Sequence, residues 1–297
     1  MEIRASHKLV RKVKDSLFDE DKLDRYHLTV IAGSSDLQIL VSDSSTGKFI
    51  LLEDYVFPDS SDNIGVGLSS IRHLFDSHQL LQAGFWKQVT VGVKNQKFTQ
   101  LPERLFDAQN LKPLLGLNVN LDDQDNHFFW NGSVETDVIT VFAVSDGLFS
   151  WLNNFYPKKN IRFIHQSAAL IAGVETLHKG DDRLYAYIDR FKLHVLAMGQ
   201  HGLRFYNQFQ IRQFSDYTRY LMTVIGQMGL RQDICPVTLY GFVGKDSPHV
   251  HELRRYIKTL ELGIRPATLT WSSAFDEIQD HQFFDIFAVS HLRPTAS

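Results

Sequence analysis

Two segments of the sequence share one pattern of apolar runs and turns, and this internal repeat limits the possible folds more than any other feature. Residues 28–57 read LTVIAGSSDLQILVSDSSTGKFILLEDYVF, and residues 184–209 read LYAYIDRFKLHVLAMGQHGLRFYNQF. When Leu28 is aligned with Leu184, the two patterns stay in register without a gap from 28 to 41. Short apolar runs separated by turn residues are typical of antiparallel strands. We therefore expect a three-stranded meander in each segment and two copies of one fold.

A helical pattern follows each predicted meander. Apolar residues recur near the helical period in residues 64–81 and again in 215–229, where Ser215 is the predicted N-cap and Gly229 the predicted end. Each half then reads as strand, helix, strand and helix, at 138–144, 145–155, 161–166 and 167–177 in the first half and at 236–242, 247–260, 264–270 and 281–292 in the second. The order β-β-β-α-β-α-β-α in both halves predicts an α/β fold in which each lobe has a mixed five-stranded sheet flanked by helices.

The repeat divides the chain into an N-terminal arm at 1–24, a first lobe at 25–180 and a second lobe at 181–297. The first lobe is longer because it holds an insertion at about 94–136. In the arm, the run HKLVRKVKD at 7–15 places four basic residues among apolar ones. This pattern favours a mobile, solvated arm, with a partner-docking helix as the alternative.

Composition and charge exclude several classes of protein. The chain has 297 residues with a formal net charge of −3, so it lacks the positive surface that would attract nucleic acid or an anionic membrane. No apolar run reaches the length of about 18 residues that spans a membrane, and the start MEIRASHKLVRKVKD lacks the apolar centre of a signal peptide. The single cysteine, Cys235, cannot form an internal disulfide and reads as a buried structural thiol. We expect a cytoplasmic protein with no transmembrane segment and no nucleic-acid partner.

The order of the predicted elements, together with FTQLPERLFD at 98–107 and FIHQSAALIAG at 163–173, resembles an uncharacterised family of Bacteroidetes proteins, the domain of unknown function 3822. More distantly, the chain resembles FtsA and PilM. The resemblance implies the duplicated RNase H-like fold of the actin-like ATPases, with two lobes and a nucleotide site in the cleft between them. In that fold one phosphate loop follows the first strand of each meander, and an adenosine loop follows a later strand.

The two predicted phosphate loops depart from the pattern that the resemblance implies, which is Asp-x-Gly followed by small polar residues. The first turn reads Gly33, Ser34, Ser35, with glycine at the acidic position and serine at the glycine position. The second turn keeps the acidic residue as Asp189 but has Phe191 in place of the glycine. A side chain at the glycine position keeps backbone N–H groups away from a phosphate. Both loops are therefore degenerate.

The predicted adenosine loop lies in VTLYGFVGKDSPHV, where a strand ends in Gly241 and Gly244 before a helix begins. The free N–H groups of a helix start attract anions, and Lys245 is placed to meet a phosphate there. Glycines are also common at such turns without any nucleotide, so we treat these three as candidate cleft-lining residues. In the second phosphate loop, Arg190 is a candidate ion-pair partner of Asp189 that would turn a metal site into a structural contact.

The sequence contains no complete set of residues for the other kinds of catalysis that we considered. His249 and His251 are two apart in a predicted helix and point to different faces, which leaves no metal site. Asp189 alone does not provide the several carboxylates of a two-metal nuclease. The sequence has no P-loop and no nucleophile elbow. We therefore expect no catalytic residues and no bound metal.

Two hypotheses about function remain. The first is a non-catalytic scaffold or assembly adaptor that keeps the actin-like fold, needs no cofactor and binds a protein partner. The alternative is a nucleotide-binding actin-like ATPase with atypical loops, in which ATP and Mg²⁺ occupy the cleft. The loops favour the first hypothesis, because hydrolysis requires a backbone cradle and carboxylates that hold a metal. The sequence specifies neither a particular partner nor an oligomeric state.

Overall fold

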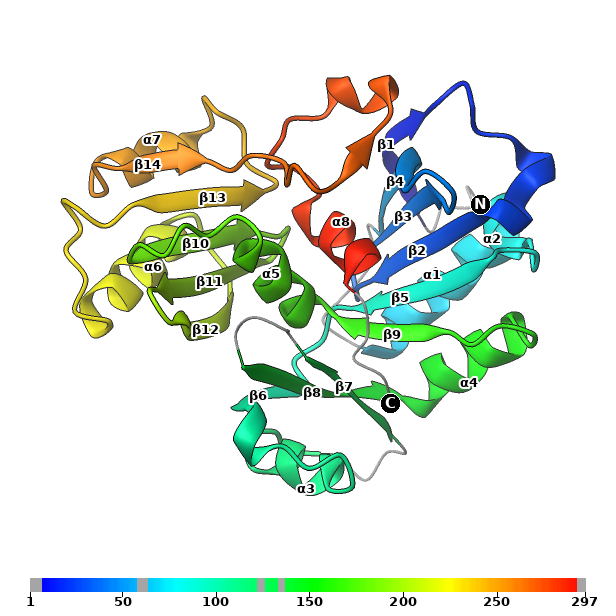
Figure 1. The fold of residues 1–297 in the computed structure, drawn as a ribbon, viewed down its shortest axis with the longest axis horizontal. Coiled ribbons are helices and arrows are strands. Elements are labelled where there is room, and N and C mark those ends of the chain that lie inside the picture. Colours follow the sequence, from blue (N-terminus) through cyan, green and yellow to red (C-terminus); the bar gives the residue numbers. More distant parts are fainter. Residues whose placement is uncertain (1–6, 58–63, 122–125, 133–136, 293–297) are drawn as a thin grey trace, which may run out of the picture.

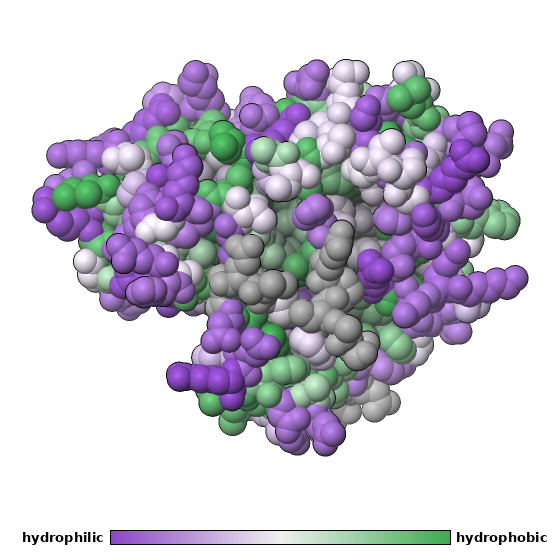
Figure 2. Space-filling view, viewed as in Figure 1, coloured by the Kyte–Doolittle hydropathy of each residue, from purple (hydrophilic) through white to green (hydrophobic). Residues whose placement is uncertain are grey.

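Three β-sheets form the framework of the protein, and helices cover their faces (Figure 1). The structure is a computed structural model that describes residues 7–57, 64–121, 126–132 and 137–292. Two of the sheets belong to the two halves of the repeat, and we call these halves lobe I and lobe II. The third sheet is smaller and lies next to lobe I. On the face of the molecule that Figure 2 shows, polar side chains cover much of the surface, with apolar side chains in patches between them.

The sheet of lobe I has seven strands. They are β1 (Lys8–Lys14), β2 (Tyr26–Ala32), β3 (Asp36–Asp43), β4 (Lys48–Val56), β5 (Gln88–Val93), β9 (Arg162–His165) and β15 (Thr270–Trp271). Their order is β1-β4-β3-β2-β5-β9, with β15 paired to β4. Strands β2, β3 and β4 form the first predicted antiparallel meander, and β5 and β9 continue the sheet in parallel with β2. The carboxyl ends of β2, β5 and β9 therefore lie at one edge of the sheet, where α/β folds commonly bind ligands.

The sheet of lobe II repeats this plan with five strands. They are β10 (Arg183–Ile188), β11 (Lys192–Gly199), β12 (Gly202–Gln210), β13 (Val237–Gly241) and β14 (Leu260–Leu262), in the order β12-β11-β10-β13-β14. Strands β10, β11 and β12 form the second predicted meander, and β13 and β14 continue the sheet in parallel. The register that aligns Leu28 with Leu184 carries β3 onto β11 residue for residue. The predicted duplicated α/β fold is confirmed, and in lobe I the five predicted strands are joined by β1 and β15, which both pair with β4.

The third sheet contains a strand that we predicted in the main sheet. It consists of β6 (Phe98–Pro102), β8 (Val138–Ser145) and β7 (Asn126–Gly132), paired antiparallel in the order β6-β8-β7, and α3 (Leu111–Gly116) packs on it. The prediction that 138–144 is the strand after the first helix of lobe I is wrong, because β5 takes that position beside β2. Both runs are short and apolar, so periodicity does not distinguish them. The inserted sheet therefore extends past 94–136 to include β8.

The basic N-terminal segment is a strand, and the prediction of a solvated arm or a helix is wrong. Strand β1 pairs antiparallel with β4 at the edge of the lobe I sheet. The Lys12 ammonium lies 2.8 Å from the buried Glu53 carboxylate, and this ion pair holds the strand in place. Charged side chains on an edge strand also hinder pairing with other chains.

The predicted strand at 264–270 does not form as a continuous strand. The chain instead forms β14 before this segment and β15 at its end, and β15 crosses over to pair with β4 of lobe I. Pro266 interrupts the segment, because proline has no N–H group to donate to a strand ladder.

The other predicted helices form, although the helix predicted at 247–260 ends at Arg254. They are α1 (Ile64–Ser77), α2 (Gln79–Gln82), α4 (Asp146–Phe155), α5 (Gln166–Glu175), α6 (Ser215–Gln227), α7 (Pro248–Arg254) and α8 (Phe284–His291), with 3-10 turns η1 (Glu20–Arg25), η2 (Glu103–Leu105) and η3 (Ser273–Glu277). Ser215 is the first residue of α6 and Phe214 is its N-cap, which corrects the predicted cap by one residue. Gly229, beyond the end of α6, has a φ of 66°, the left-handed conformation that often ends helices.

Helices α5 and α8 lie side by side between the two main sheets and connect the lobes (Figure 1). Helix α5 follows β9 of lobe I, but its Leu170 and Ile171 pack on residues of the lobe II sheet. Helix α8 comes last in lobe II, but its Ile286 and Phe287 pack on residues of the lobe I sheet. Each lobe is therefore completed by a helix from the other, and the contact between the two helices joins the lobes.

A substitution of Gly173 tests whether α5 packs closely on α8. A Cβ atom there would lie 2.8 Å from the Phe284 ring and 3.1 Å from the Ala288 Cβ atom. We expect Gly173→Ala to lower the free energy of unfolding by about 1–3 kcal/mol in urea denaturation, because overpacking forces the helices apart. Gly226→Ala on α6 is the matched control: nothing lies within 4 Å of its Cβ position, and helix propensity should add about 0.5–1 kcal/mol. Equal effects of the two variants would contradict the close packing.

Candidate functional site

The first predicted phosphate loop, residues 33–35, joins β2 to β3 and is fixed by protein contacts. Helix α1 lies against it, so that a Cβ atom on Gly67 would be 2.9 Å from the Ser34 Cα atom. The Ser35 carbonyl accepts a hydrogen bond from the backbone N–H of Phe57 at 2.9 Å. The loop does not offer the glycine-lined cradle that a phosphate requires.

Asp189, the acidic residue of the second loop, follows β10 and is 5% exposed. Its Oδ1 accepts the backbone N–H of Arg190 at 2.8 Å, and its Oδ2 accepts the Gln166 amide at 3.2 Å. The Lys94 ammonium lies 3.4 Å from Oδ1. Burial would raise the pKa of Asp189, but the charge of Lys94 and the hydrogen bonds from Arg190 and Gln166 act together against burial, and the pKa is lowered. The carboxylate is therefore ionised, and a lysine neutralises it.

Lys94, one residue beyond β5, is the centre of the site. Its ammonium lies 2.9 Å from Asp36 Oδ2, 3.4 Å from Asp189 Oδ1 and 3.7 Å from Asp285 Oδ2. All four side chains are at most 6% exposed. Burial alone would lower the pKa of Lys94, but the three carboxylates outweigh it and raise the pKa, so the amine is protonated. A cation of the protein itself thus occupies the point where carboxylates of both lobes converge.

Arg190 forms a second bridge between the lobes. Its guanidinium lies 2.7 Å from Asp36 Oδ2 and 2.5 Å from Asp54 Oδ2, both in lobe I. The predicted ion pair between Arg190 and Asp189 is therefore wrong. Arg190 pairs with lobe I, because Lys94 already lies beside the Asp189 carboxylate.

Four carboxylates, those of Asp36, Asp54, Asp189 and Asp285, share these two cations. Burial raises the pKa of Asp54 to about 6, against the lowering effect of Arg190. Burial also raises the pKa of Asp285. The buried network contains more carboxylates than cations, so it retains protons more readily than exposed carboxylates do.

The first turns of α5 and α8 also face the network. Gln166, the first residue of α5, donates its side-chain amide to Asp189 at 3.2 Å and to Asp285 at 2.9 Å. Asp285 is the second residue of α8 and is fully buried. The free N–H groups at a helix N-terminus carry partial positive charge. Both helices therefore offset part of the excess negative charge.

The predicted adenosine loop is filled by protein contacts. Gly241 pairs with Ile188 on the neighbouring strand, and a Cβ atom on Gly241 would lie 2.2 Å from the Ile188 carbonyl oxygen. Its φ of 95° also requires glycine. The backbone N–H groups of Gly241 and Phe242 donate to the carbonyls of His281 and Ile188, both at 2.8 Å. The Phe242 ring covers the Arg190 guanidinium at 4.3 Å.

The structure brings some of the predicted site residues together and leaves others apart. Asp189 directly follows Ile188, the partner of Gly241, so the second phosphate loop and the adenosine loop begin on neighbouring strand ends. Gly244 and Lys245 lie further along the loop, and Lys245 is exposed. Within the described part of the chain, Lys245 forms no ion pair with the network. A role of these residues in nucleotide binding stays a prediction.

The sequence analysis missed Lys94, Asp36, Asp54 and Asp285. Lys94 follows an apolar run at the carboxyl end of a parallel strand, and this position was the available signal. Asp54 lies within the apolar run ILLEDYVF, where a buried charge requires a partner. Asp36 and Asp285 carry no local signal, because the residues that they meet are distant in sequence.

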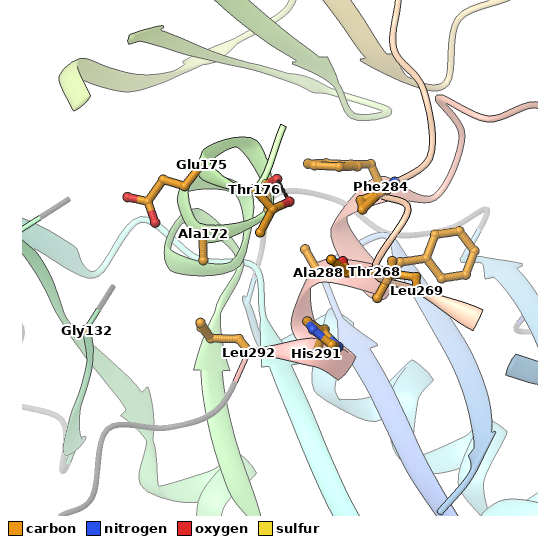
Figure 3. A pocket seen from close by; sticks show the side chains of 13 residues that line it. Gly132, Ala172, Glu175, Thr176, Thr268, Leu269, Phe284, Ala288, His291 and Leu292 are labelled. Carbon is orange, nitrogen blue, oxygen red and sulfur yellow. Dashed lines mark hydrogen bonds between the residues drawn. The ribbon is translucent and has the colours of Figure 1, made fainter. Parts of the chain in front are cut away.

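A cavity of about 300 Å³ lies between α5 and α8 (Figure 3). Ala172 from α5 and Thr176 just beyond its end line it together with Ala288 and His291 from α8. Phe284, the first residue of α8, also lines it. The cavity therefore lies at the contact between the two helices, and none of the residues predicted for nucleotide binding, all of which the structure describes, lines it.

Solved structures share this fold. A protein from Bacteroides thetaiotaomicron VPI-5482 with an actin-like ATPase fold and unknown function aligns with a TM-score of 0.71 at 19% identity, over 83% of this chain and 94% of that one. PilM, from the PilM–PilN type IV pilus biogenesis complex, aligns with a TM-score of 0.59 at 11% identity, over 90% and 99%. A search of curated proteins found no match. The protein therefore has the actin-like ATPase fold.

The family assignment is more specific than the fold. The sequence matches the family described as protein of unknown function (DUF3822) over residues 15–260. The chain belongs to this family, and the resemblance seen in the sequence is confirmed. The Bacteroides relative agrees with the Bacteroidetes family that the sequence resembles. Among the residues that the structure describes, no helix is both long and apolar enough to cross a membrane.

The site does not fit the Mg²⁺ ion and nucleotide phosphates that an actin-like ATPase would bind. Lys94 already neutralises the carboxylates that a metal would need, and Phe191 stands at a loop position that needs glycine. In the described ranges of the chain, no group of three or more His, Cys, Asp or Glu side chains is arranged to hold a metal ion.

The contribution of Lys94 to the free energy of unfolding can be tested by substitution. We expect Lys94→Met to lower the free energy of unfolding by about 3–5 kcal/mol at pH 7, because it leaves buried carboxylates without a cation. The loss should shrink at pH 4, where those carboxylates take up protons. Lys87→Met is the matched control, since Lys87 is exposed and its ammonium donates to the Ser44 hydroxyl at 3.0 Å; its effect should stay within about 0.5 kcal/mol. A small, pH-independent loss for Lys94→Met in urea denaturation would contradict this account.

Proposed function

We propose that the protein is a non-catalytic scaffold or assembly adaptor that keeps an actin-like fold and works by binding another protein. The observation that carries the proposal is the Lys94 ammonium at the meeting point of three buried carboxylates. Phosphoryl transfer would require a metal and a phosphate cradle in this cleft. A cation that is fixed to the chain closes the cleft without nucleotide and repels a second cation.

Two observations support the binding of a protein partner, and a third supports a location in the cytoplasm. Phe191, which replaces the loop glycine, is 54% exposed, and exposed aromatic side chains are favoured anchors in protein interfaces. The fold relative PilM occurs in a complex with PilN, so a chain of this fold takes part in a protein assembly. Cys235 is a free, buried thiol, which suits a reducing compartment.

The alternative function is a nucleotide-binding ATPase with atypical loops. Asp189 favours it, because this carboxylate is present in the second loop at the position where a metal shell needs one. The Asp189 carboxylate is already held by Lys94 and Gln166, however, and a metal-bound nucleotide would have to displace both. We therefore rank this function second.

We expect no ATP hydrolysis above background and no stabilisation by Mg-ATP or Mg-ADP. A ligand at 100 times its Kd would add about 2.7 kcal/mol to stability, which a thermal-shift scan detects. Steady-state phosphate release is measured for the wild type and for Asp189→Ala, with an active actin-like ATPase as positive control. Background release from both proteins agrees with a scaffold. Turnover in the wild type that a folded Asp189→Ala variant lacks would establish the ATPase instead.

A further inference from the structure

We propose that the buried ion network is a proton-sensitive latch, which holds the two lobes closed under mildly acidic conditions and loosens as the pH rises. The proposal concerns the regulation of the site described above, and it rests on the proposed scaffold function only for its biological use. Three features of the structure support it. The cations of each lobe bind carboxylates of the other lobe, the network has more carboxylates than cations, and the helices α5 and α8 join the two lobes.

Two cations reach from one lobe to the other. Arg190, in the turn after β10 of lobe II, binds Asp36 and Asp54 on β3 and β4 of lobe I. Lys94, at the end of β5 of lobe I, contacts Asp189 after β10 of lobe II. Separation of the lobes would remove these partners and expose the carboxylates to water. The Arg190 and Lys94–Asp189 contacts therefore exist only in the closed arrangement, whereas the Lys94–Asp36 pair lies within lobe I.

Asp54 is the group that makes the latch depend on protons. The charged groups that face it are Arg190 from lobe II and Asp36 and Lys94 from lobe I. Directly opposite on the neighbouring strands lie Gln38 of β3 and Arg11 of β1, whose guanidinium pairs with Glu277. Among the described residues, Asp54 Oδ1 and both polar atoms of the Gln38 side chain have no hydrogen-bond partner. A proton on Asp54 would supply a donor at this position and would remove one buried negative charge.

The direction of the pH effect follows from the two environments of Asp54. In the closed protein, burial raises the pKa of Asp54 to about 6 from its ordinary value of 3.8. When the lobes separate, water reaches the carboxylate and the pKa returns toward the ordinary value. The closed state therefore binds the proton more tightly and is favoured by acid. The ratio of closed to open protein should fall by up to about 100-fold as the pH rises from about 4 to about 7.

The other titratable groups of the network do not reverse this direction. Burial raises the pKa of Asp285, which acts in the same sense. Burial would raise the pKa of Asp189, but Lys94 lowers it, so Asp189 titrates below this pH range. Burial lowers the pKa of His194 to about 3, so its imidazole is neutral in the closed protein. Its partners Tyr206 and Tyr187 belong to the same lobe, so we expect His194 to stay covered and neutral when the lobes separate. Burial raises the pKa of Tyr187 well above its usual value, so its phenol keeps its proton.

The contact between α5 and α8 is the hinge of the proposed opening motion. Gly173 of α5 packs against Phe284 and Ala288, and Gln166 at the start of α5 donates to Asp285, next to Phe284. A rotation about this helix contact would break the bridges that Arg190 and Lys94 make between the lobes. Such a motion has a smaller free-energy cost than separation of the apolar cores.

The experiment measures the distance between the lobes as a function of pH. Spin labels are attached to Phe85→Cys in lobe I and Tyr256→Cys in lobe II, which replace side chains that are 74% and 42% exposed, in a Cys235→Ser background. Double electron–electron resonance then gives the distance distribution from pH 5 to pH 8 without nucleotide or partner. We expect one distance at pH 5 and a second, longer distance whose share grows with a midpoint near pH 6.

Three variants connect this change to the network. Asp54→Asn should keep the single short distance at pH 5 and pH 8, because its side chain stays neutral. Arg190→Gln should show the longer distance at both pH values, because it removes the bridge to Asp36 and Asp54. The matched control Asp246→Asn, at an exposed carboxylate of lobe II, should behave as the wild type.

A wild-type distance distribution that is the same from pH 5 to pH 8 would overturn the latch, and so would a wild-type response in Asp54→Asn. If a variant does not fold, a carbon-13 NMR titration of the wild-type aspartates decides instead, and an ordinary pKa for Asp54 would also overturn the proposal. The readout uses no ATP and no partner. If the distance measurement contradicts the latch, the scaffold proposal is unaffected. If ATP turnover is found, the scaffold proposal is wrong but the latch is unaffected.

Discussion

The Lys94 ammonium among three buried carboxylates is the interaction on which the rest of the structure depends. A buried charge without a partner is strongly destabilising, so each member of the network is stable only when the others are in place. Asp36 comes from β3, Asp189 from the turn after β10 and Asp285 from α8. One electrostatic requirement therefore fixes the position of both main sheets and of the last helix.

The duplicated architecture explains why these charges meet. In each lobe the parallel strands end at one edge of the sheet, and the loops at these two edges contact each other through Arg190 and Lys94. The first turns of α5 and α8 point at the same place and add partial positive charge. This arrangement is suited to anions and metal ions, and the same features stabilise a network of four side-chain carboxylates and two side-chain cations.

Sequence reasoning succeeded where the signal is local and periodic. The two meanders could be predicted because the repeat keeps its register from 28 to 41. It failed where pairing is long-range: β5 and β8 are both short apolar runs, and only tertiary contacts decide which one lies beside β2. The site shows the same limit. Asp189 could be predicted from the order of the loops. The role of Lys94 could not, because its partner Asp189 belongs to the other lobe and is distant in the sequence.

A cation supplied by a side chain changes what controls the cleft. In a nucleotide-dependent protein, closure depends on ligand concentration, because the ligand binds the closed state more tightly than the open one. Lys94 and Arg190 are always present at a fixed local concentration, so under the proposed function the lobes close without a ligand. The remaining variable is the charge of the carboxylates, and burial raises the pKa of Asp54 to about 6, close to physiological pH. Under the proposed function, the charge balance of the buried network therefore takes the regulatory place that a bound nucleotide holds in an ATPase of this fold.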